Sequence, residues 1–281
     1  MTIIDGKAVS ANLREKIKAE AALLPEKPGL AVILVGDDPA SQTYVKNKKL
    51  ACEQCGFYSE EYRLPASTTQ EELLLLIEKL NCDDKINGIL VQLPVPEHID
   101  DVAVIQAISP EKDVDAFGYE NVGKIMIGNF HYVPCTPAGV MQLLKAYNIE
   151  IGGKNAVVVG RSNIVGKPQA MLLLHANATV TIAHSKTANL ADVTKNADIL
   201  VSAVGIPKFI KKDMVKDGAV VIDVGMNRDE NGKLCGDVDF EAVKDKTSYI
   251  TPVPGGVGPM TITMLMQNTL ESKKQQIQKN K

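Results

Sequence analysis

VVVGRSNIVGKP occupies residues 157–168, and this stretch decides how the chain around it is interpreted. The three valines predict a buried strand, and Pro168 opens a predicted helix that ends at His175. Between them, glycine lets the backbone approach a phosphate, and the helix N-terminus presents oriented N–H donors. The strict GxGxxG spacing is absent, so two interpretations stay open: a nucleotide-binding turn, or an ordinary tight turn from strand to helix.

The sequence downstream of this turn continues to alternate between strands and helices. The predicted strands are TVTIAH at 179–184, DILVSAV at 198–204 and AVVIDVG at 219–225. They predict a Rossmann-like, doubly wound parallel sheet. The chain becomes helical again from Met260, and its last residues, KKQQIQKNK at 273–281, form a polar basic run that we expect to fray in solvent.

A second alternating series lies upstream. Helical spacing of apolar residues predicts helices at 9–24, 41–55 and 68–80, the last begun by Thr68 with Glu71 completing a capping box. The predicted strands are LAVILVG at 30–36, FYSEEYRL at 57–64 and INGILVQLP at 86–94. This β-α-β-α-β order predicts a parallel sheet covered by helices, with ligands at the carboxyl ends of its strands.

Length and a change in composition predict two α/β domains with a cleft between them. A chain of 281 residues has room for about two domains. Around residues 118–137 the composition shifts to Gly, Asn and Pro, and Thr136-Pro137 is typical of an N-cap followed by proline at the first helical position. We therefore expect a catalytic domain at 1–137 and a nucleotide domain at 138–281, with the helix from about 260 packing back on the first domain.

Composition excludes several classes of protein. The apolar fraction of 45% and charged fraction of 23% are those of a globular protein, and a net charge of −3 gives no general attraction to nucleic acid or anionic lipid. We expect no secretory signal in the N-terminal residues, which mix charges with apolar residues, and prolines and glycines interrupt the charge-free stretch at 247–270. Five cysteines without dense spacing favour a reducing compartment. We expect a cytoplasmic protein that binds neither nucleic acid nor a membrane.

The strand after the glycine turn bears on which dinucleotide would bind. In NAD-binding folds this strand usually ends in a carboxylate that binds the ribose hydroxyls, but here it ends in His184-Ser185-Lys186-Thr187. Arg161 and Ser185 could instead surround a 2′-phosphate, with Lys186 a further candidate, which favours NADP over NAD. The alternative is that Arg161 and Lys186 are ordinary surface cations.

Five polar residues of the first domain are candidates for chemistry. Tyr44 and Lys48 are four residues apart on a predicted helix, with Ser41 one turn earlier, and they form either a binding face or a solvated helix edge. Gln92 closes a buried strand, where a polar side chain needs a partner. Asp115 lies near the expected junction of the domains, where it could bind paired donors or merely form a turn.

These residues stand in motifs that resemble the bifunctional methylenetetrahydrofolate dehydrogenase/methenyltetrahydrofolate cyclohydrolase family. The most specific are YVKNK at 44–48 and PGGVGPMT at 254–261, joined by VQLP, PCTP, GRSNIVGKP and HSKT, and the resemblance covers essentially the whole chain. It implies NADP as the cofactor, tetrahydrofolate derivatives as substrates, oxidation of the methylene to the methenyl derivative, hydrolysis to 10-formyltetrahydrofolate, and a homodimer formed through the nucleotide domain.

The resemblance also implies roles for individual residues, without a metal. The implied catalytic residues are Lys48 for proton transfer, Gln92 to orient it, Tyr44 to stack on the folate and Asp115 to anchor the pterin. Other implied substrate contacts are Ser41, Leu93, Pro254, Gly255, Gly256, Val257 and Gly258. Implied NADP contacts are Gly160, Arg161, Ser162, Ser185 and Met226.

One position departs from the family pattern, and two other functions stay open. Ala116 follows Asp115 where the family typically has glycine, so alanine is strained if the backbone there needs positive φ. Cys52 and Cys55 have redox-motif spacing, but they close a helix, so we interpret them as buried structural thiols. Two other functions are the alternatives to the bifunctional folate enzyme. One is an NADP-dependent dehydrogenase of another small substrate, and the other is a non-catalytic NADP- or folate-binding regulator.

Overall fold

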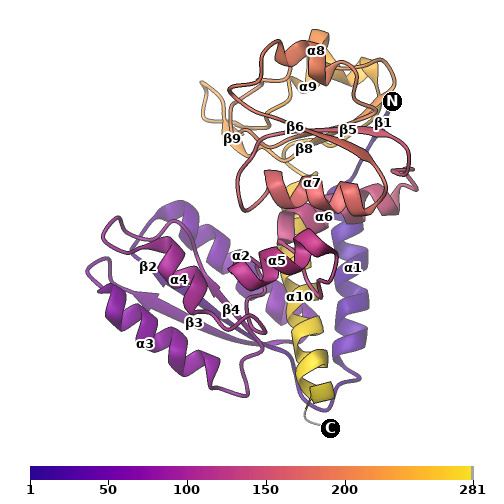
Figure 1. Cartoon of the computed structure of the whole chain (residues 1–281). Helices are drawn as coiled ribbons and strands as arrows, with labels where there is room; N and C mark the ends of the chain where they lie inside the picture. The colour runs from indigo at the N-terminus through magenta and orange to yellow at the C-terminus, as the bar shows by residue number, and fades with distance from the viewer. Residues whose placement is uncertain (280–281) are drawn as a thin grey trace. The chain divides into compact units, whose positions relative to one another are not determined.

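The computed structural model describes residues 1–279, which divide into two compact units (Figure 1). Unit 1 comprises Met1–Ala11 and Thr136–Thr261, and unit 2 comprises Asn12–Cys135 and the chain from Ile262 onward. Both units are therefore discontinuous, unlike the expected division at residue 137. Among the helices, α1 (Gly6–Ala21) and α10 (Val257–Lys279) contribute several residues to each unit.

Unit 1 contains a six-stranded parallel sheet, which confirms the Rossmann-like, doubly wound α/β fold. The strands are β1 (Thr2–Ile3), β5 (Asn155–Val159), β6 (Thr179–Ala183), β7 (Ile199–Ser202), β8 (Ala219–Asp223) and β11 (Thr247–Ile250). Their order is β1-β11-β8-β7-β5-β6, with parallel pairing throughout. Pairing of β1 with β11 explains why the first residues group with this unit rather than with the first domain.

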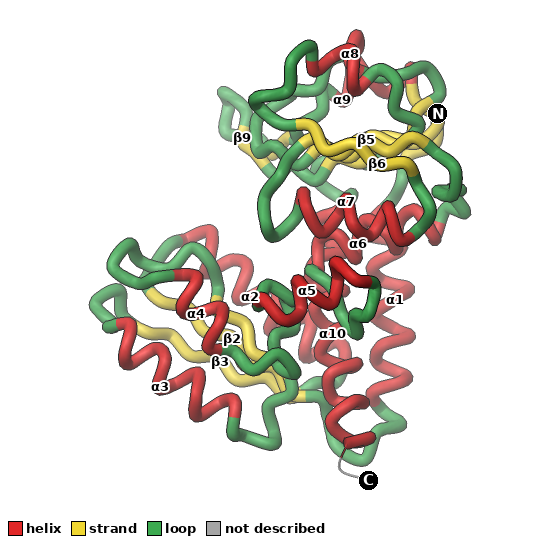
Figure 2. The backbone as a smooth tube through the Cα atoms, viewed as in Figure 1, coloured by secondary structure: helices red, strands yellow, loops and turns green. Residues whose placement is uncertain are grey.

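Helices cover both faces of the unit 1 sheet. In Figure 2, α7 (Gly166–His175) lies on one face and α8 (Leu190–Thr194) on the other. Val157, Leu200 and Val221, from strands that are neighbours in the sheet, belong to a buried core on which α8 packs. The unit also contains α6 (Cys135–Ala146), α9 (Phe240–Val243), the 3₁₀ turns η1 (Lys212–Met214) and η2 (Lys244–Lys246), and the hairpin of β9 (Asn227–Arg228) and β10 (Leu234–Cys235).

Unit 2 is built on a three-stranded parallel sheet in the order β3-β2-β4. Its strands are β2 (Gly29–Val35), β3 (Tyr58–Leu64) and β4 (Gly88–Val91), and its helices include α2 (Pro39–Cys55), α3 (Gln70–Asn81), α4 (Asp101–Ala107) and α5 (Tyr119–Ile127). Every residue of β2 is buried. Alternate side chains such as Ile33 pack against Leu73 and Ile77 of α3, because successive side chains of a strand point to opposite faces.

Two helix starts differ from the sequence prediction. The capping box of α3 is formed by Thr69 and Glu72, not by Thr68 and Glu71. Thr68 instead lies in the preceding turn, where its N–H donates to Pro65 and its carbonyl oxygen lies 2.8 Å from His98 Nε2. Likewise α6 begins at Cys135, so Thr136 lies inside the first turn, and its hydroxyl pairs with that of Thr261 at 3.0 Å.

The prediction that the C-terminal basic run frays is wrong for its described part. Helix α10 continues to Lys279, and residues 280–281 lie outside the described chain. Lys273 is only 5% exposed and its Nζ lies 2.8 Å from a carboxylate oxygen of Glu26. Lys274 pairs with Glu20 at 2.6 Å. These partners lie some 250 residues earlier in the chain, so charge pattern alone could not reveal them.

Candidate functional site

Helix α2 presents three of the candidate residues of unit 2. Proline at its first position and the Asp38 carboxylate, which accepts the Ser41 N–H at 2.7 Å, fix where the helix begins. Ser41 is buried, Tyr44 is 39% exposed and Lys48 is half-buried. The spacing of four residues places Tyr44 and Lys48 on one face of the helix.

Gln92 holds the amine of Lys48. Lys48 Nζ donates to Gln92 Oε1 at 2.8 Å, and Gln92 Nε2 donates to the Leu93 carbonyl at 2.7 Å. The backbone of Gln92 is itself fixed just beyond β4, because its N–H donates to Ile33 in the neighbouring strand at 2.8 Å. The two strands thus orient the glutamine, and the glutamine orients the lysine.

Burial favours the neutral form of the Lys48 amine. Removal from solvent lowers the pKa of Lys48, and this effect exceeds the opposing influences of Asp115 and Cys135, which favour the ammonium form. The same desolvation raises the pKa of Asp115, against the attraction of Lys48. Both groups are therefore shifted toward their neutral forms, and a neutral amine is a proton acceptor.

The segment that carries Asp115 is attached to the edge of the unit 2 sheet. Asp113 forms a parallel bridge with Ile89 of β4, and the Ile89 N–H donates to the backbone carbonyl of Lys112 at 2.8 Å. The buried Asp113 carboxylate then accepts the Gly118 N–H at 2.8 Å and the Asn121 side-chain amide at 2.9 Å. The turn between Asp113 and Gly118 carries Asp115.

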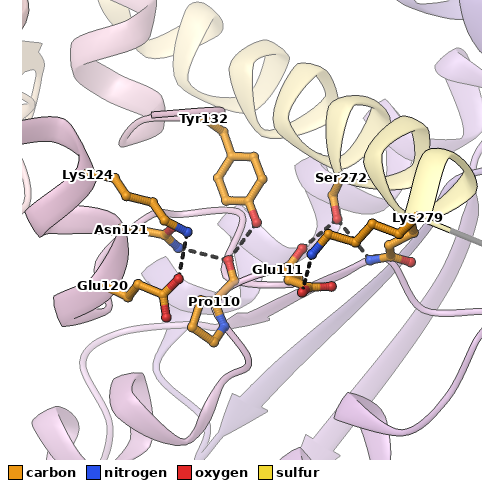
Figure 3. A network of polar contacts seen from close by, with 9 residues as sticks. Pro110, Glu111, Glu120, Asn121, Lys124, Tyr132, Ser272 and Lys279 are labelled. Carbon is orange, nitrogen blue, oxygen red and sulfur yellow. Dashed lines mark hydrogen bonds and ion pairs between the residues drawn. The ribbon is translucent and has the colours of Figure 1, made fainter. Parts of the chain in front are cut away.

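Further polar contacts fix the chain on both sides of this turn (Figure 3). The Pro110 carbonyl accepts the Tyr132 hydroxyl at 2.6 Å and the Asn121 amide at 3.0 Å. From α10, the Ser272 hydroxyl donates to the Glu111 carbonyl at 2.7 Å. The Asp115 turn is therefore held by elements distant from it in sequence.

The structure adds Cys135, to which no sequence pattern assigned a role. Its buried Sγ lies 3.5 Å from Asp115 Oδ1. The Asn268 side-chain amide donates to the carbonyls of Val114 at 2.8 Å and Val133 at 2.9 Å, and lies 3.6 Å from the same sulfur. Burial raises the pKa of the Cys135 thiol, so it acts as a neutral donor to Asp115. The PCTP motif was the signal that could have identified it.

Ala116, which stands where the family typically has glycine, adopts the left-handed backbone conformation. Its φ is +55°, and its side chain is fully buried. A residue other than glycine rarely adopts this region, at a cost of about 1–2 kcal/mol. The backbone at Ala116 is held there by its N–H, which donates to the Asp113 carbonyl at 2.9 Å.

In unit 1, the glycine turn after β5 is packed too tightly for side chains. A Cβ on Gly160, whose φ is +131°, would lie 2.3 Å from the Ala203 oxygen, and one on Gly166 would lie 2.3 Å from the Gly160 oxygen. The Ser162 hydroxyl accepts the N–H groups of Val165 and Gly166 at 3.2 Å, at the start of α7. This close backbone cradle at a helix N-terminus fits a dinucleotide phosphate.

Arg161 and Ser185 extend from neighbouring strand ends. Val159 of β5 pairs with Ala183 of β6, so each candidate lies two residues beyond the same rung of the sheet. Both side chains are exposed. His184 is occupied in its own turn, where Nδ1 accepts the Lys186 N–H at 3.1 Å, in agreement with a structural histidine.

The glycine-rich segment 254–258 meets a predicted cofactor residue within unit 1. A Cβ on Gly258 would lie 3.0 Å from Met226 Cε, so these two candidates are neighbours. Gly255 has a φ of +108°, and a Cβ on Gly256 would lie 2.6 Å from the Pro252 oxygen. The tight turn exposes Pro254 and leaves backbone groups as its main chemistry.

The remaining sequence features carry no chemistry in this structure. Cys52 and Cys55 are buried, and burial raises their pKa values to about 12 and about 11, as expected of inert structural thiols. Across residues 1–279, His, Cys, Asp and Glu side chains form no group of three that could hold a metal ion. None of the described helices is long and apolar enough to cross a membrane.

The candidates thus form two groups. Lys48, Gln92 and Asp115 lie together in unit 2, with Ser41, Tyr44 and Leu93 on the same elements. The other candidates belong to unit 1, where they follow the carboxyl ends of β5, β6, β8 and β11: Gly160, Arg161, Ser162, Ser185, Met226 and the segment 254–258.

Comparison with protein-family models gives two matches that together cover most of the chain. Residues 4–115 match the model described as "Tetrahydrofolate dehydrogenase/cyclohydrolase, catalytic domain". Residues 134–277 match "Tetrahydrofolate dehydrogenase/cyclohydrolase, NAD(P)-binding domain".

Individual relatives match over their full length. The chain is 61% identical to the bifunctional protein FolD of Campylobacter hominis, with 100% of both chains covered. It resembles the crystal structure of the FolD dehydrogenase/cyclohydrolase from Campylobacter jejuni with a TM-score of 0.96 and 53% identity, covering 98% of this chain and 99% of the other. For the Trypanosoma brucei FolD, solved with NADP cofactor and an inhibitor, the TM-score is 0.94 and the identity 43%, covering 99% of this chain and 98% of the other.

Proposed function

The chain belongs to the tetrahydrofolate dehydrogenase/cyclohydrolase family, and we propose on this premise that it is a bifunctional enzyme of one-carbon metabolism. It oxidises 5,10-methylenetetrahydrofolate with NADP to the 5,10-methenyl derivative, and it hydrolyses that product to 10-formyltetrahydrofolate. The observation that supports hydrolysis most directly is the half-buried Lys48 amine held by the amide of Gln92.

The oxidation needs alignment more than acid–base chemistry. When bound, NADP supplies the nicotinamide that accepts the hydride. The reacting folate carbon lies between two nitrogens, whose lone pairs stabilise the cation that hydride loss creates, so the protein's task is mainly to align the reactants. The cradle at Gly160 and Gly166 fits the dinucleotide phosphates, and Arg161, Ser162, Ser185 and Met226 are the predicted further contacts.

The hydrolysis does need a proton acceptor. Water adds to the methenyl carbon and loses a proton, and opening of the ring then requires a proton on the departing nitrogen. A lysine with an ordinary pKa of about 10.4 is neutral only about once in 2,500 at pH 7. Desolvation lowers the pKa of Lys48, and the uncharged Gln92 positions it without restoring the charge. We assign proton transfer to Lys48.

The other candidates of unit 2 bind the folate in this proposal. Tyr44 offers an exposed ring for stacking, and the Asp115 carboxylate, which lies 3.5 Å from Cys135 Sγ, accepts paired donors of the pterin. Ser41 and Leu93 stay predicted contacts on the same elements. The segment 254–258 of unit 1 stays a predicted folate contact.

An absorbance assay tests the proposed function. Methylenetetrahydrofolate is supplied with NADP or NAD, and the appearance and later decay of the methenyl product are followed. Lys48→Met is expected to abolish the decay while dehydrogenation continues, whereas Lys46→Met, an exposed lysine on the same helix, leaves both steps intact. Failure of the wild-type protein to form methenyl product would overturn the proposal, and equal loss of both activities in a folded, folate-binding Lys48→Met variant would overturn the role of Lys48.

We further infer a homodimer formed through unit 1, in the cytoplasm. Strand β6 is an edge strand that exposes Thr179, Thr181 and Ile182, and an open edge can pair with a second copy. Sedimentation of wild type and Ile182→Lys tests the dimer, because a charge on the edge should yield monomers.

The cysteines support the inferred location in the cytoplasm. All five are free thiols, as expected in a reducing compartment.

A further inference from the structure

Unit 1 contains two buried carboxylates that the proposed site does not include. Asp223 ends β8 and is 2% exposed, and Asp237 follows β10 and is fully buried. Two buried acids so close together are costly unless many donors satisfy them. Their hydrogen bonds therefore show what the fold gains from retaining them.

The Asp237 carboxylate joins two segments that are separate in the chain. Its Oδ2 accepts the Val204 N–H at 2.7 Å and the Ser202 hydroxyl at 3.2 Å. Its Oδ1 accepts the Ile206 N–H at 3.1 Å and the Asn227 side-chain amide at 2.9 Å. One carboxylate thus holds the end of β7, the loop that follows it and the first residue of β9.

Asp223 holds the backbone of Asp237 in turn. Its Oδ1 accepts the N–H groups of Gly225 and Asp237, both at 2.9 Å, and its Oδ2 accepts the Val238 N–H at 2.8 Å. Burial raises the pKa of Asp223 to about 7, against the effect of these donors. The two acids and the segments that they join form one connected network.

Two glycines make room for this network. A Cβ on Gly236 would lie 1.8 Å from Asp223 Oδ2, and a Cβ on Gly225 would lie 2.2 Å from Asp237 Oδ1. Neither glycine needs a left-handed φ. Close approach to a carboxylate is therefore what excludes a side chain at both positions.

The loop held by Asp237 borders the dinucleotide crevice. Strand order reverses between β5 and β7, and ligands of doubly wound sheets bind at the carboxyl ends of the strands on either side of such a reversal. Ala203, next to Val204, packs directly on the glycine turn, since its oxygen would lie 2.3 Å from a Cβ on Gly160. Asn227, also held by Asp237, adjoins the predicted cofactor contact Met226.

We propose that Asp237 is a positioning residue for NADP, which fixes the loops after β7 and β8 before the dinucleotide binds. The proposal rests on the proposed function, because it assumes that unit 1 binds NADP. Without the carboxylate, the N–H groups of Val204 and Ile206 lose their acceptor, and the two loops must be ordered at the expense of binding free energy.

The test compares Asp237→Asn with Asp239→Asn in the full-length protein. Asp239 is a matched control because its carboxylate pairs with Lys211, at 3.1 Å, near the surface. We expect the Kd for NADPH, measured by calorimetry, to rise roughly tenfold or more in Asp237→Asn and to change less than twofold in Asp239→Asn. In the cofactor-free protein, hydrogen exchange should accelerate only in Asp237→Asn, at whichever of the Val204 and Ile206 amides faces the new NH2 group.

A third measurement separates positioning from general damage. Cyclohydrolase activity on supplied methenyltetrahydrofolate needs no dinucleotide, so its kcat and KM should be unchanged in Asp237→Asn. An unchanged Kd for NADPH, unchanged exchange at the two amides, or an equal loss of cyclohydrolase activity would overturn the proposal. If Asp237→Asn does not fold, Asn227→Ala removes one donor to the same carboxylate, and an unchanged Kd in that variant overturns the proposal. Failure of the wild-type protein to bind NADPH would instead refute the proposed function.

Discussion

Lys48 Nζ donates to Gln92 Oε1 at 2.8 Å, so an uncharged amide is the hydrogen-bond partner of the amine. A carboxylate at this position would orient the amine equally well, but it would also stabilise the ammonium form. The choice of amide therefore lets the site combine a fixed amine with a lowered pKa. The pH dependence of hydrolysis therefore gives the most direct measure of whether Lys48 is neutral.

Gln92→Glu should move the pH profile of the cyclohydrolase. The reaction needs neutral Lys48, so its rate rises with pH and levels off above the pKa of that amine. A carboxylate within hydrogen-bonding distance raises the lysine pKa, so the rise in rate moves to higher pH and the rate at pH 7 falls about tenfold or more. The measurement is kcat against pH on methenyltetrahydrofolate.

Gln106→Glu provides the matched control for this shift. The Gln106 side-chain oxygen accepts the Tyr119 N–H at 3.0 Å on the exposed side of α4, and a glutamate can do the same while adding an equal charge. Its profile should coincide with that of the wild type. A Gln92→Glu profile that also coincided would mean that Lys48 does not set the pH dependence.

The local part of this site could be predicted from sequence, and the distant part could not. Tyr44 and Lys48 share a helix face through their spacing, and Gln92 follows an apolar strand, so each is visible in a short window. Cys135 and Asn268 reach the Asp115 turn from positions 20 and 154 residues away. Such partners depend on tertiary packing, which no local pattern encodes.

Arg161→Ala should weaken the binding of NADP but not that of NAD. A guanidinium beside the 2′-phosphate contributes a charge-assisted hydrogen bond of about 1.5–3 kcal/mol, so its loss should raise the Kd for NADP roughly ten- to a hundred-fold. Arg228→Ala is the control, since that exposed guanidinium donates to the Gly232 carbonyl at 2.7 Å in the β9–β10 hairpin. Equal affinity of wild type and Arg161→Ala for NADP would refute the assignment.

Asn268→Ala should destabilise unit 2 and loosen the Asp115 turn together. Its amide serves two buried carbonyls, of Val114 and Val133, which would be left without this donor, at a cost of about 2 kcal/mol or more. Urea denaturation followed by circular dichroism measures the loss in the free energy of unfolding. A raised KM for folate shows that the Asp115 turn has loosened. Gln267→Ala, the preceding residue on α10, should leave both values near those of the wild type.

The same distinction between local and distant information applies to the fold. The repeated strands and helices of both units follow from apolar patterns, but the assignment of the first residues to unit 1 depends on pairing of β1 with β11, some 247 residues away. Helix α5 was not expected because its segment is rich in glycine and asparagine. Its ends are glycines, of which Gly128 has a φ of +76°, as a helix C-terminus requires.

Substitutions of Ala116 test the strained turn beside Asp115. Glycine removes the strain of a φ of +55° but also removes a buried methyl group worth about 0.8 kcal/mol, so Ala116→Gly should change the free energy of unfolding by less than about 1 kcal/mol. Valine adds a β-branched side chain in the left-handed region, at a fully buried position, so Ala116→Val should cost more than about 2 kcal/mol and raise the KM for folate. Urea denaturation and steady-state kinetics provide both values. If Ala116→Val were as stable as the wild type, the backbone at this position would not be left-handed in solution.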